Sequence, residues 1–263
     1  MGLCYSILRG RPMKAIIVAA GPGSRLMPFT EGKPKCLLDI GGQTILERAL
    51  GALRENGING IVVVTGYYGH LINYPNVTYY HNPAFRNNNI LRSLFYAERE
   101  MDDDFIFSYS DILYSKAIVE KLINSEGDIA LVVDVNWLER YRGRDLHPVS
   151  EAELVKVEKG RVTRVGKEAV EASEAHGEFI GLAKFTKAAA QAMRAIYHEI
   201  ARESPTASFH HATCLEKAYM TDMIQELADR GSFVKSVDIK DGWMEIDTPQ
   251  DLAEAQRRFA SNR

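Results

Sequence analysis

The sequence predicts an α/β fold built from parallel strands and connecting helices. Short apolar runs, of which residues 15–20 are the first, have the length and composition of strands that are buried on both faces. Segments with apolar residues at helical spacing alternate with these runs through the first half of the chain. This alternation indicates parallel strands joined by right-handed crossovers, and 263 residues are enough to bury the core of such a fold.

The elements of the first half follow from this spacing. The segment 44–56 is predicted to be a helix, because its apolar residues recur at helical intervals and Gly57 follows it as a C-terminal cap. Further helices are expected at residues 90–101 and 115–124. Strands are expected at residues 15–20, 58–65, 77–81, 105–110 and 129–135.

The second half is less regular. Residues 151–157 and 161–165 form an expected hairpin through Lys159 and Gly160. Thr248 and Pro249 give the closing helix an N-cap and a first-turn proline. No repeat or linker interrupts the chain, so we predict one domain over residues 13–263, preceded by an extension over residues 1–12. The other expected elements are strands at 179–185 and 233–239 and helices at 187–201, 221–230 and 248–259.

Charge and cysteine content exclude several classes of protein. The formal net charge is −3, which argues against a nucleic-acid partner because such proteins usually carry a basic face. Cys4, Cys36 and Cys214 are too far apart to suggest a disulfide framework or a zinc site, so we expect a reducing, cytoplasmic setting. No apolar run has the length of a membrane span, and no membrane partner is expected.

A glycine-containing turn follows the first predicted strand. The run is Ala19-Ala20-Gly21-Pro22-Gly23-Ser24-Arg25-Leu26, and Pro28, Thr30, Pro34 and Lys35 come after it. Two glycines allow the backbone to pass close to a phosphate chain with its N–H groups facing the anion. Arg25 and Lys35 can then neutralise a triphosphate.

Two other phosphate motifs do not fit this turn. A dinucleotide-binding fingerprint requires a third glycine at the position of Leu26, and a P-loop requires Ser or Thr where Pro34 follows Gly32 and Lys33. An ordinary strand-to-loop turn is the remaining alternative. The arginine, the Pro-x-Thr and the Lys-Pro-Lys at their spacings make the phosphate-binding interpretation the stronger one.

These residues resemble the nucleotidyltransferase family that activates sugar phosphates, phosphocholine and phosphonates. The family pattern falls on Gly21, Gly23, Arg25, Leu26, Pro28, Thr30, Pro34 and Lys35, with Phe29 in place of a usual leucine. The resemblance implies a Rossmann-like three-layer α/β/α fold with a mostly parallel, mixed sheet. It implies that Arg25 and Lys35 are catalytic, with Arg25 on the leaving pyrophosphate and Lys35 on the α-phosphate. It also implies that the nucleotide lies on Ala19, Ala20, Gly21, Gly23 and Ser24.

Two aspartates complete the implied site. Asp111 follows the strand at 105–110, and Asp247 precedes the closing helix. The resemblance implies that these two positions are the magnesium ligands. Mg²⁺ favours one or two carboxylates together with phosphate oxygens and water. We therefore expect Mg²⁺ as the cofactor, although either aspartate alone could be a solvated loop acid or a helix-start residue.

The choice of nucleotide depends on Asn88 and Asn89. The arrangement Asn-Asn-x-x-x-Ser-Leu in this region resembles the cytidylyltransferase branch of the family, including the phosphocholine and aminoethylphosphonate enzymes. Asparagine amides offer a donor and an acceptor, which suits a cytosine edge or a ribose. The alternative is that these asparagines form a turn and cap the helix that begins near Ile90.

The acceptor site is expected in the segment after the strand at 129–135, which resembles phosphonate cytidylyltransferases. Arg142, Arg144 and Lys167 could hold a phosphonate or phosphate dianion. Trp137, Tyr141 and Asp145 could hold an ammonium group. The alternative is a surface loop with self-paired charges. His147 is interpreted as structural.

The predicted function is therefore transfer of CMP from CTP to a small phosphonate or phosphomonoester, with release of pyrophosphate. The preferred acceptor is 2-aminoethylphosphonate, followed by phosphocholine. A sugar- or inositol-1-phosphate nucleotidyltransferase is the alternative enzyme, and a non-catalytic nucleotide-binding regulator is the alternative of another class. A homodimer is compatible with the sequence.

Overall fold

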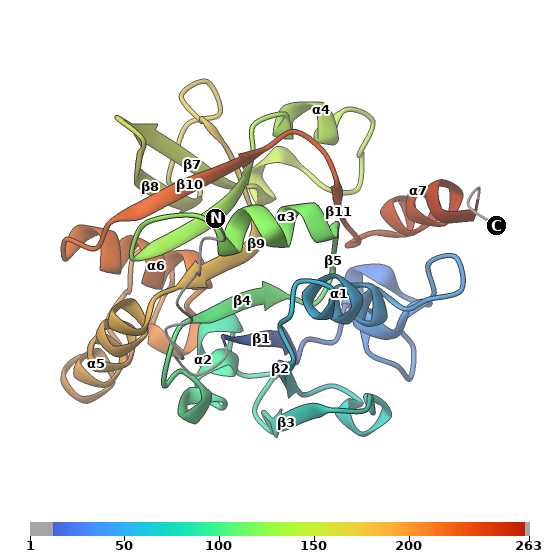
Figure 1. Cartoon of the computed structure of the whole chain (residues 1–263), viewed down its shortest axis with the longest axis horizontal. Coiled ribbons are helices and arrows are strands. Elements are labelled where there is room, and N and C mark those ends of the chain that lie inside the picture. The colour runs from blue at the N-terminus through green and yellow to red at the C-terminus, as the bar shows by residue number, and fades with distance from the viewer. Residues whose placement is uncertain (1–12, 261–263) are drawn as a thin grey trace, which may run out of the picture.

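The computed structural model describes residues 13–260, which form a mixed sheet covered by helices (Figure 1). The helices are α1 Ile45–Arg54, α2 Ile90–Phe95, α3 Lys116–Ile123, α4 Trp137–Tyr141, α5 Lys187–Glu203, α6 Met220–Asp229 and α7 Pro249–Ala260. The strands are β1 Lys14–Ala19, β2 Gly60–Thr65, β3 Val77–His81, β4 Phe105–Tyr109, β5 Ile112–Tyr114, β6 Ile129–Asp134, β7 Glu153–Glu158, β8 Arg161–Lys167, β9 Gly177–Phe185, β10 Val234–Ile239 and β11 Trp243–Glu245.

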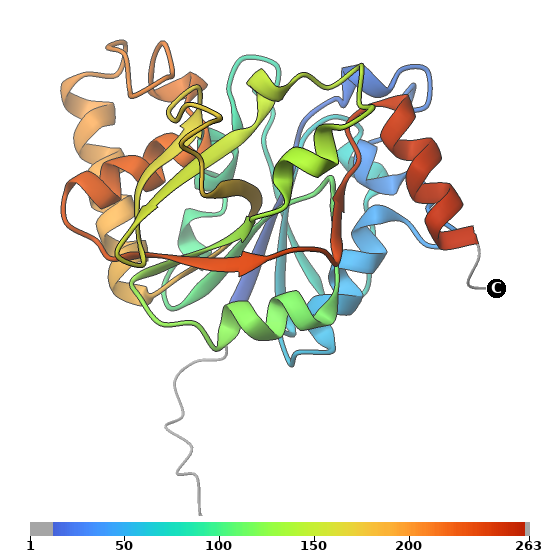
Figure 2. The same ribbon diagram turned by 90° about the horizontal axis from the view of Figure 1, so that it is seen from above.

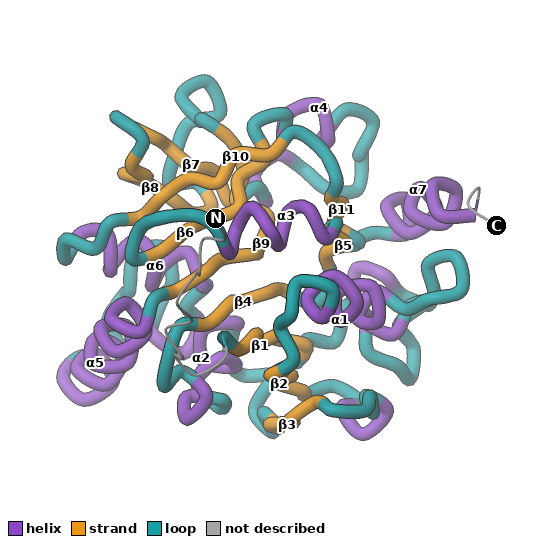
Figure 3. Tube along the Cα trace, in the orientation of Figure 1, coloured by secondary structure: helices purple, strands orange, loops and turns teal. Residues whose placement is uncertain are grey.

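The main sheet has the strand order β3-β2-β1-β4-β9-β6-β10-β8-β7. Strands β3, β2, β1 and β4 are parallel, and β9 inserts antiparallel between β4 and β6. Strand β7 also pairs with β9, which closes one end of the sheet upon itself. The expected mostly parallel, mixed sheet is confirmed, and Figure 3 shows its strands between two sets of helices.

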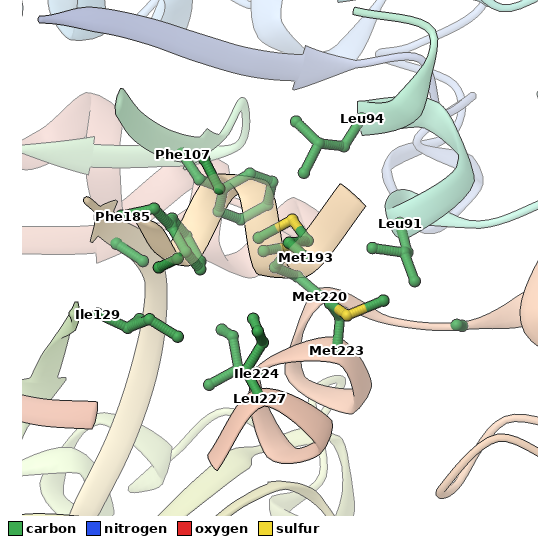
Figure 4. Packing of buried hydrophobic residues seen from close by; sticks show 14 of the residues in the cluster. Leu91, Leu94, Phe107, Ile129, Phe185, Met193, Met220, Met223, Ile224 and Leu227 are labelled. Carbon is green, nitrogen blue, oxygen red and sulfur yellow. The ribbon is translucent and has the colours of Figure 1, made fainter. Parts of the chain in front are cut away.

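Alternation of side chains along the strands builds a core on each face of the sheet. Ile16 and Val18 of β1 point into a cluster with α2, α5 and α6, whereas Ala15 and Ile17 point into a second cluster with α1 and α3. Figure 4 shows the first cluster, in which Met193, Met223 and Leu227 pack against strand residues, and Figure 2 shows the helices on the two sides of the sheet. The three-layer prediction is confirmed.

Helix α1 illustrates how local sequence fixes an element. Thr44 Oγ1 accepts from the Glu47 N–H at 3.0 Å and the Thr44 N–H donates to Glu47 Oε2 at 2.7 Å, which is a capping box. Ile45, Leu46 and Leu53 face the core. The chain leaves the helix through Gly57, whose φ is 79°.

The structure departs from the predicted elements in two places. The expected helix at 90–101 ends at Phe95 and is followed by a separate 3₁₀ turn at Glu98–Glu100, where Glu100 is held by Lys14 at 2.8 Å and by Tyr80 at 2.7 Å. The sequence analysis did not predict α4, β5 or β11. Within the described residues, no helix is both long and apolar enough to cross a membrane.

Candidate active site

A cleft of about 350 Å³ opens beside the carboxyl ends of β1 and β4. Ligand sites in open α/β sheets lie at this edge, in the crevice that forms where the connections after neighbouring strands run to opposite faces of the sheet. The nucleotide-binding residues expected from the sequence all line the cleft: Ala19, Ala20, Gly21, Gly23, Ser24, Asn88 and Asn89. So do Arg25, Lys35, Asp111, Lys167 and Asp247.

The loop after β1 is shaped by two glycines with different roles. Gly23 has a φ of 60°, and a Cβ there would lie 2.9 Å from Lys35 Cβ. Thr30 Oγ1 donates to the Gly23 carbonyl at 2.9 Å and holds the loop closed. A Cβ on Gly21 would meet nothing within 4 Å, so that position leaves open space in the cleft. This backbone can therefore approach an anion closely.

A short two-stranded sheet brings the two expected metal ligands together. Strand β11 pairs antiparallel with β5, with Glu245 opposite Ile112. The Ile246 N–H then donates to the Asp111 carbonyl at 2.9 Å, which places Asp247 next to Asp111 at the cleft. The three residues of each strand are too few to show a period in the sequence, which is why this pairing was not predicted.

Lys35 lies between these two aspartates. Its Nζ is 2.7 Å from Asp111 Oδ2 and 2.9 Å from Asp247 Oδ1. Burial disfavours the ammonium form, yet the two carboxylates raise the pKa of Lys35 above its ordinary value. Arg25 Nη2 lies 2.7 Å from Asp247 Oδ2, although the guanidinium is half exposed.

Asp247 is charged at neutral pH. Burial favours its neutral acid, but His147, Lys35 and Arg25 together hold the pKa of Asp247 well below its usual range. His147 Nδ1 lies 3.3 Å from Asp247 Oδ2, and His147 Nε2 lies 3.5 Å from Glu245 Oε2. His147 is buried, lies against both carboxylates and lines the cleft.

The donor set fits a magnesium ion better than a transition metal. Asp111 Oδ1 is buried without a hydrogen-bond donor, so it has a lone pair to offer. Asp247 Oδ2 is buried too, and its neighbours are Arg25 Nη2 at 2.7 Å and His147 Nδ1 at 3.3 Å. Ligand atoms of His147, Glu245 and Asp247 also lie within 4.8 Å of one another. Magnesium prefers oxygen ligands to imidazole, which favours the pair Asp111 and Asp247.

The two asparagines expected to read the base differ in their contacts. Asn89 caps α2, since its Oδ1 accepts from the Ile90 N–H at 2.9 Å and its Nδ2 donates to the Lys217 carbonyl at 3.0 Å. Asn88 Oδ1 accepts from the buried Asn82 at 2.8 Å. The capping alternative therefore holds for Asn89, and Asn88 is the better candidate for contact with a base.

The structure does not bring the expected acceptor cluster into the cleft, except for Lys167. The Arg142 side chain is 75% exposed and pairs with Glu139 at 2.7 Å, and Asp145 is exposed. Arg144 is bound by Asp251 at 2.8 Å and by Glu245 at 3.1 Å. The alternative of a surface loop with self-paired charges therefore describes both arginines, because each forms ion pairs with neighbouring carboxylates.

The aromatic members of that cluster lie behind the cleft wall. Trp137 and Tyr141 are buried in a small apolar cluster with Leu154 and Val170. Tyr141 reaches the cleft only indirectly, since its hydroxyl donates to Glu178 Oε1 at 2.6 Å. An ammonium group in the cleft could not contact either ring face in this arrangement.

The part of the cleft around Lys167 contains residues to which no role was assigned from the sequence. Glu153 and Glu178 line it, as do Tyr109, Tyr219 and Glu151. Lys167 Nζ lies 2.7 Å from Glu151 Oε2 and 4.8 Å from the centre of the Tyr219 ring. Glu178 stands directly before the apolar run 179–183, which is the signal that could have identified it, whereas Glu153 shares its strand with Lys156 and Glu158 and has no such signal.

An α/β sheet with a glycine-containing loop at the end of its first strand is typical of nucleotide-binding α/β proteins. Residues 15–232 match the model of the MobA-like NTP transferase domain, and the chain belongs to this family. It is therefore a nucleotidyltransferase, and the comparisons give no support to the alternative of a non-catalytic regulator.

Two relatives and one solved structure extend this comparison. The chain is 34% identical to the CTP:phosphoglutamine cytidylyltransferase of Campylobacter jejuni, over 91% of this chain and 98% of that protein. It is 31% identical to the choline-phosphate cytidylyltransferase of Streptococcus pneumoniae, over 43% of this chain and 51% of that protein. An inositol-1-phosphate CTP transferase from T. maritima shares the fold, with a TM-score of 0.72 and 23% identity over 96% of this chain and 98% of that one.

Proposed function

We propose that this protein transfers CMP from CTP to a small phosphorylated acceptor and releases pyrophosphate. The observation that carries the proposal is the position of Lys35, which joins Asp111 and Asp247 at the mouth of a glycine loop. Family membership supports nucleotidyl transfer, and the relative that aligns over nearly the whole chain uses CTP by its name.

The proposed reaction is an in-line displacement at the α-phosphorus of CTP. An anionic oxygen of the acceptor forms the new P–O bond, and the bond between the α-phosphorus and the bridging oxygen of the β-phosphate breaks. Both electrons of that bond leave with pyrophosphate. No strong general base is required, because the attacking phosphate or phosphonate oxygen is already ionised at neutral pH.

The residues act mainly by positioning and charge neutralisation. Backbone N–H groups of the loop at residues 21–24 would hold the triphosphate. Lys35 would exchange its contacts with the aspartates for the α-phosphate oxygens, where negative charge gathers during the displacement. Arg25 stands at the rim of the same cleft, and its guanidinium suits the leaving pyrophosphate.

Mg²⁺ is the proposed cofactor, with Asp111 and Asp247 as its protein ligands. Asp111 offers a buried carboxylate oxygen without a hydrogen-bond donor, and Asp247 would exchange contacts with Arg25 and Lys35 for the ion. The bound ion would supply positive charge at the α-phosphate and the acceptor.

The acceptor is proposed to be a small molecule that carries both a phosphorus oxyanion and a nitrogen cation. Phosphoglutamine and choline phosphate, which the two relatives' names contain, share these two features. Lys167 is the only member of the expected acceptor set that lines the cleft within the described part of the chain. Phosphoglutamine therefore joins 2-aminoethylphosphonate and phosphocholine as an acceptor to test.

A coupled assay for pyrophosphate release tests this function. The purified protein is incubated with Mg²⁺, one of the four ribonucleoside triphosphates and one acceptor at a time. Release with CTP, dependent on both the acceptor and Mg²⁺, is the expected result. Equal release with every triphosphate, or none with CTP, would contradict the assignment.

Transfer to a sugar or inositol phosphate is the second candidate function. The shared fold with an inositol-1-phosphate CTP transferase favours keeping it in the test. Inositol-1-phosphate and glucose-1-phosphate therefore belong in the same acceptor panel. Faster pyrophosphate release with either than with every amine-bearing acceptor would favour this alternative.

A further inference from the structure

Two buried glutamates line the cleft in the region around Lys167. Glu153 is the first residue of β7. Glu178 lies in β9 and pairs with Leu154, the residue that follows Glu153. Both line the cleft, although only 6% of Glu153 and 7% of Glu178 is exposed. The two carboxylates therefore border one cleft in poorly solvated surroundings, each from a different face of the β7–β9 pair.

Only neutral hydroxyl groups of the protein bind these two carboxylates. Glu153 accepts from the Tyr109 hydroxyl at 2.9 Å and from the Thr221 hydroxyl at 2.8 Å. Glu178 accepts from the Tyr141 hydroxyl at 2.6 Å. In the part of the chain that the structure describes, neither forms an ion pair with a lysine, arginine or histidine.

The other acidic side chains of the cleft behave differently. Asp111 and Asp247 contact Lys35, Glu151 contacts Lys167, and Glu245 contacts Arg144. Lys167 and Arg144 are the cations that most affect the two glutamates, yet both are engaged by these other carboxylates. The pair Glu153 and Glu178 is thus left without a counter-ion of its own.

A buried carboxylate without a cation is unfavourable, and the protonation of the pair reflects this. Burial raises the pKa of Glu153 to about 7 and the pKa of Glu178 to about 8. A ligand that brings positive charge would restore both carboxylates to their ionised form. A hydroxyl-bearing ligand would only add to the hydroxyl donors already present and would leave the charge uncompensated.

We propose that Glu153 and Glu178 form a subsite for a positively charged nitrogen of the acceptor, so that the cleft selects phosphorylated amines over equally sized neutral phosphates. This inference rests on the proposed function, which places a phosphorylated acceptor in this part of the cleft. The aromatic ring of Tyr109 also lines this region, and ring faces favour a cation. The acceptor's phosphoryl end would face Lys35, and its amine would face the glutamates.

Matched ligand pairs test the subsite by equilibrium binding, which does not depend on turnover. In the first pair, 2-aminoethylphosphonate is compared with propylphosphonate, where a methyl group replaces the ammonium. In the second, choline phosphate is compared with 3,3-dimethylbutyl phosphate, where carbon replaces the quaternary nitrogen. Calorimetry is run with and without a non-hydrolysable CTP analogue.

The wild-type protein should bind the charged member of at least one pair roughly tenfold or more tightly, as expected for a hydrogen-bonded charge. Glu178→Gln should reduce that preference roughly tenfold. Glu153→Gln provides the same test if the first variant does not fold. The matched control is Glu174→Gln, since Glu174 is exposed and pairs with Lys156; it should leave the preference unchanged.

Two results would overturn the inference. One is a wild-type protein that binds both members of each pair equally. The other is a preference for the charged member that survives in Glu178→Gln and in Glu153→Gln. Failure of the proposed function would give a different result. The protein would then bind the charged member of a ligand pair more tightly than the neutral member, yet release no pyrophosphate from CTP.

Discussion

Lys35 and Asp247 stand 212 positions apart in the chain, and a hydrogen bond of 2.9 Å joins Lys35 Nζ to Asp247 Oδ1. Apolar packing fixes this approach, because Leu26 of the loop segment shares one buried cluster with Ile246 and with Leu252 of α7. The last helix of the chain therefore holds one half of the charged centre against the first loop. In the ligand-free protein, each of the two charged groups is the counter-ion of the other.

Lys35→Ala should lower kcat by roughly a hundredfold or more and change the KM for CTP much less. The reason is that its contact with the α-phosphate should strengthen as charge develops in the transition state. Lys33→Ala is the control, since Lys33 does not line the cleft. Steady-state kinetics decide the matter: an unchanged kcat with a raised KM would make Lys35 a binding residue only.

Asp111→Asn and Asp247→Asn should each lower turnover by roughly a hundredfold or more, because each removes a charge that the proposed ion requires. Each variant should also weaken Mn²⁺ binding, as measured by electron paramagnetic resonance with Mn²⁺ in place of Mg²⁺. Asp241→Asn, at an exposed position next to β11, should behave like the wild type. Near wild-type turnover and Mn²⁺ binding in either site variant would refute the metal assignment.

The two loop glycines should respond differently to alanine. Gly23→Ala should lower the free energy of unfolding, because φ is 60° there and the added Cβ would lie 2.9 Å from Lys35 Cβ. Gly21→Ala should leave stability nearly unchanged but raise the KM for CTP, since its Cβ would fill open space in the cleft. Urea unfolding and kinetics on both variants test this; equal losses of stability would show that open space is not the role of Gly21.

Glu178 should make stability depend on pH. Burial raises its pKa to about 8, so between the ordinary carboxyl pKa of about 4.5 and that value the folded protein binds more protons than the unfolded chain. Its contribution to stability is therefore present at low pH and is lost as pH rises through this window. Relative to Glu178→Gln, the wild type should lose roughly 1–3 kcal/mol of unfolding free energy between pH 5.5 and 8.

Urea denaturation of both proteins at the two pH values measures this difference. Glu174→Gln serves as the control, because an exposed carboxylate should not contribute a comparable change. A difference between wild type and Glu178→Gln that stays constant from pH 5.5 to 8 would mean that Glu178 does not titrate in this range.

Much of the fold could be predicted from the sequence, because its long elements carry strong periodic patterns. The strand at 77–81 has the predicted bounds, and α5 and α7 begin where Thr186 and Thr248 precede them. The short elements could not be predicted. Strands β5 and β11 have three residues each, and only the tertiary pairing of Glu245 with Ile112 defines them.

The candidate site was predicted unevenly, for a physical reason. The loop residues and Lys35 lie close together in the chain, between positions 19 and 35, so their spacing alone indicates a phosphate site. The prediction of the acceptor site depends on which charged side chains are already neutralised by a neighbour. The sequence does not show that Arg144 is bound by Asp251, nor that Glu178 lacks a cation partner among the described residues. The acceptor was therefore expected beside arginines that are paired with carboxylates in the structure, and the two glutamates were assigned no role.

Transfer of label from [α-³²P]CTP tests the central claim most directly. The protein is incubated with Mg²⁺ and, in turn, phosphoglutamine, 2-aminoethylphosphonate or choline phosphate, and the products are separated and identified by mass. The account predicts that the α-phosphorus appears in a CMP-linked acceptor, in amounts equal to the pyrophosphate released and absent without acceptor. Label that stays in CTP, or that appears only as free CMP whichever of these acceptors or inositol-1-phosphate is present, would contradict it.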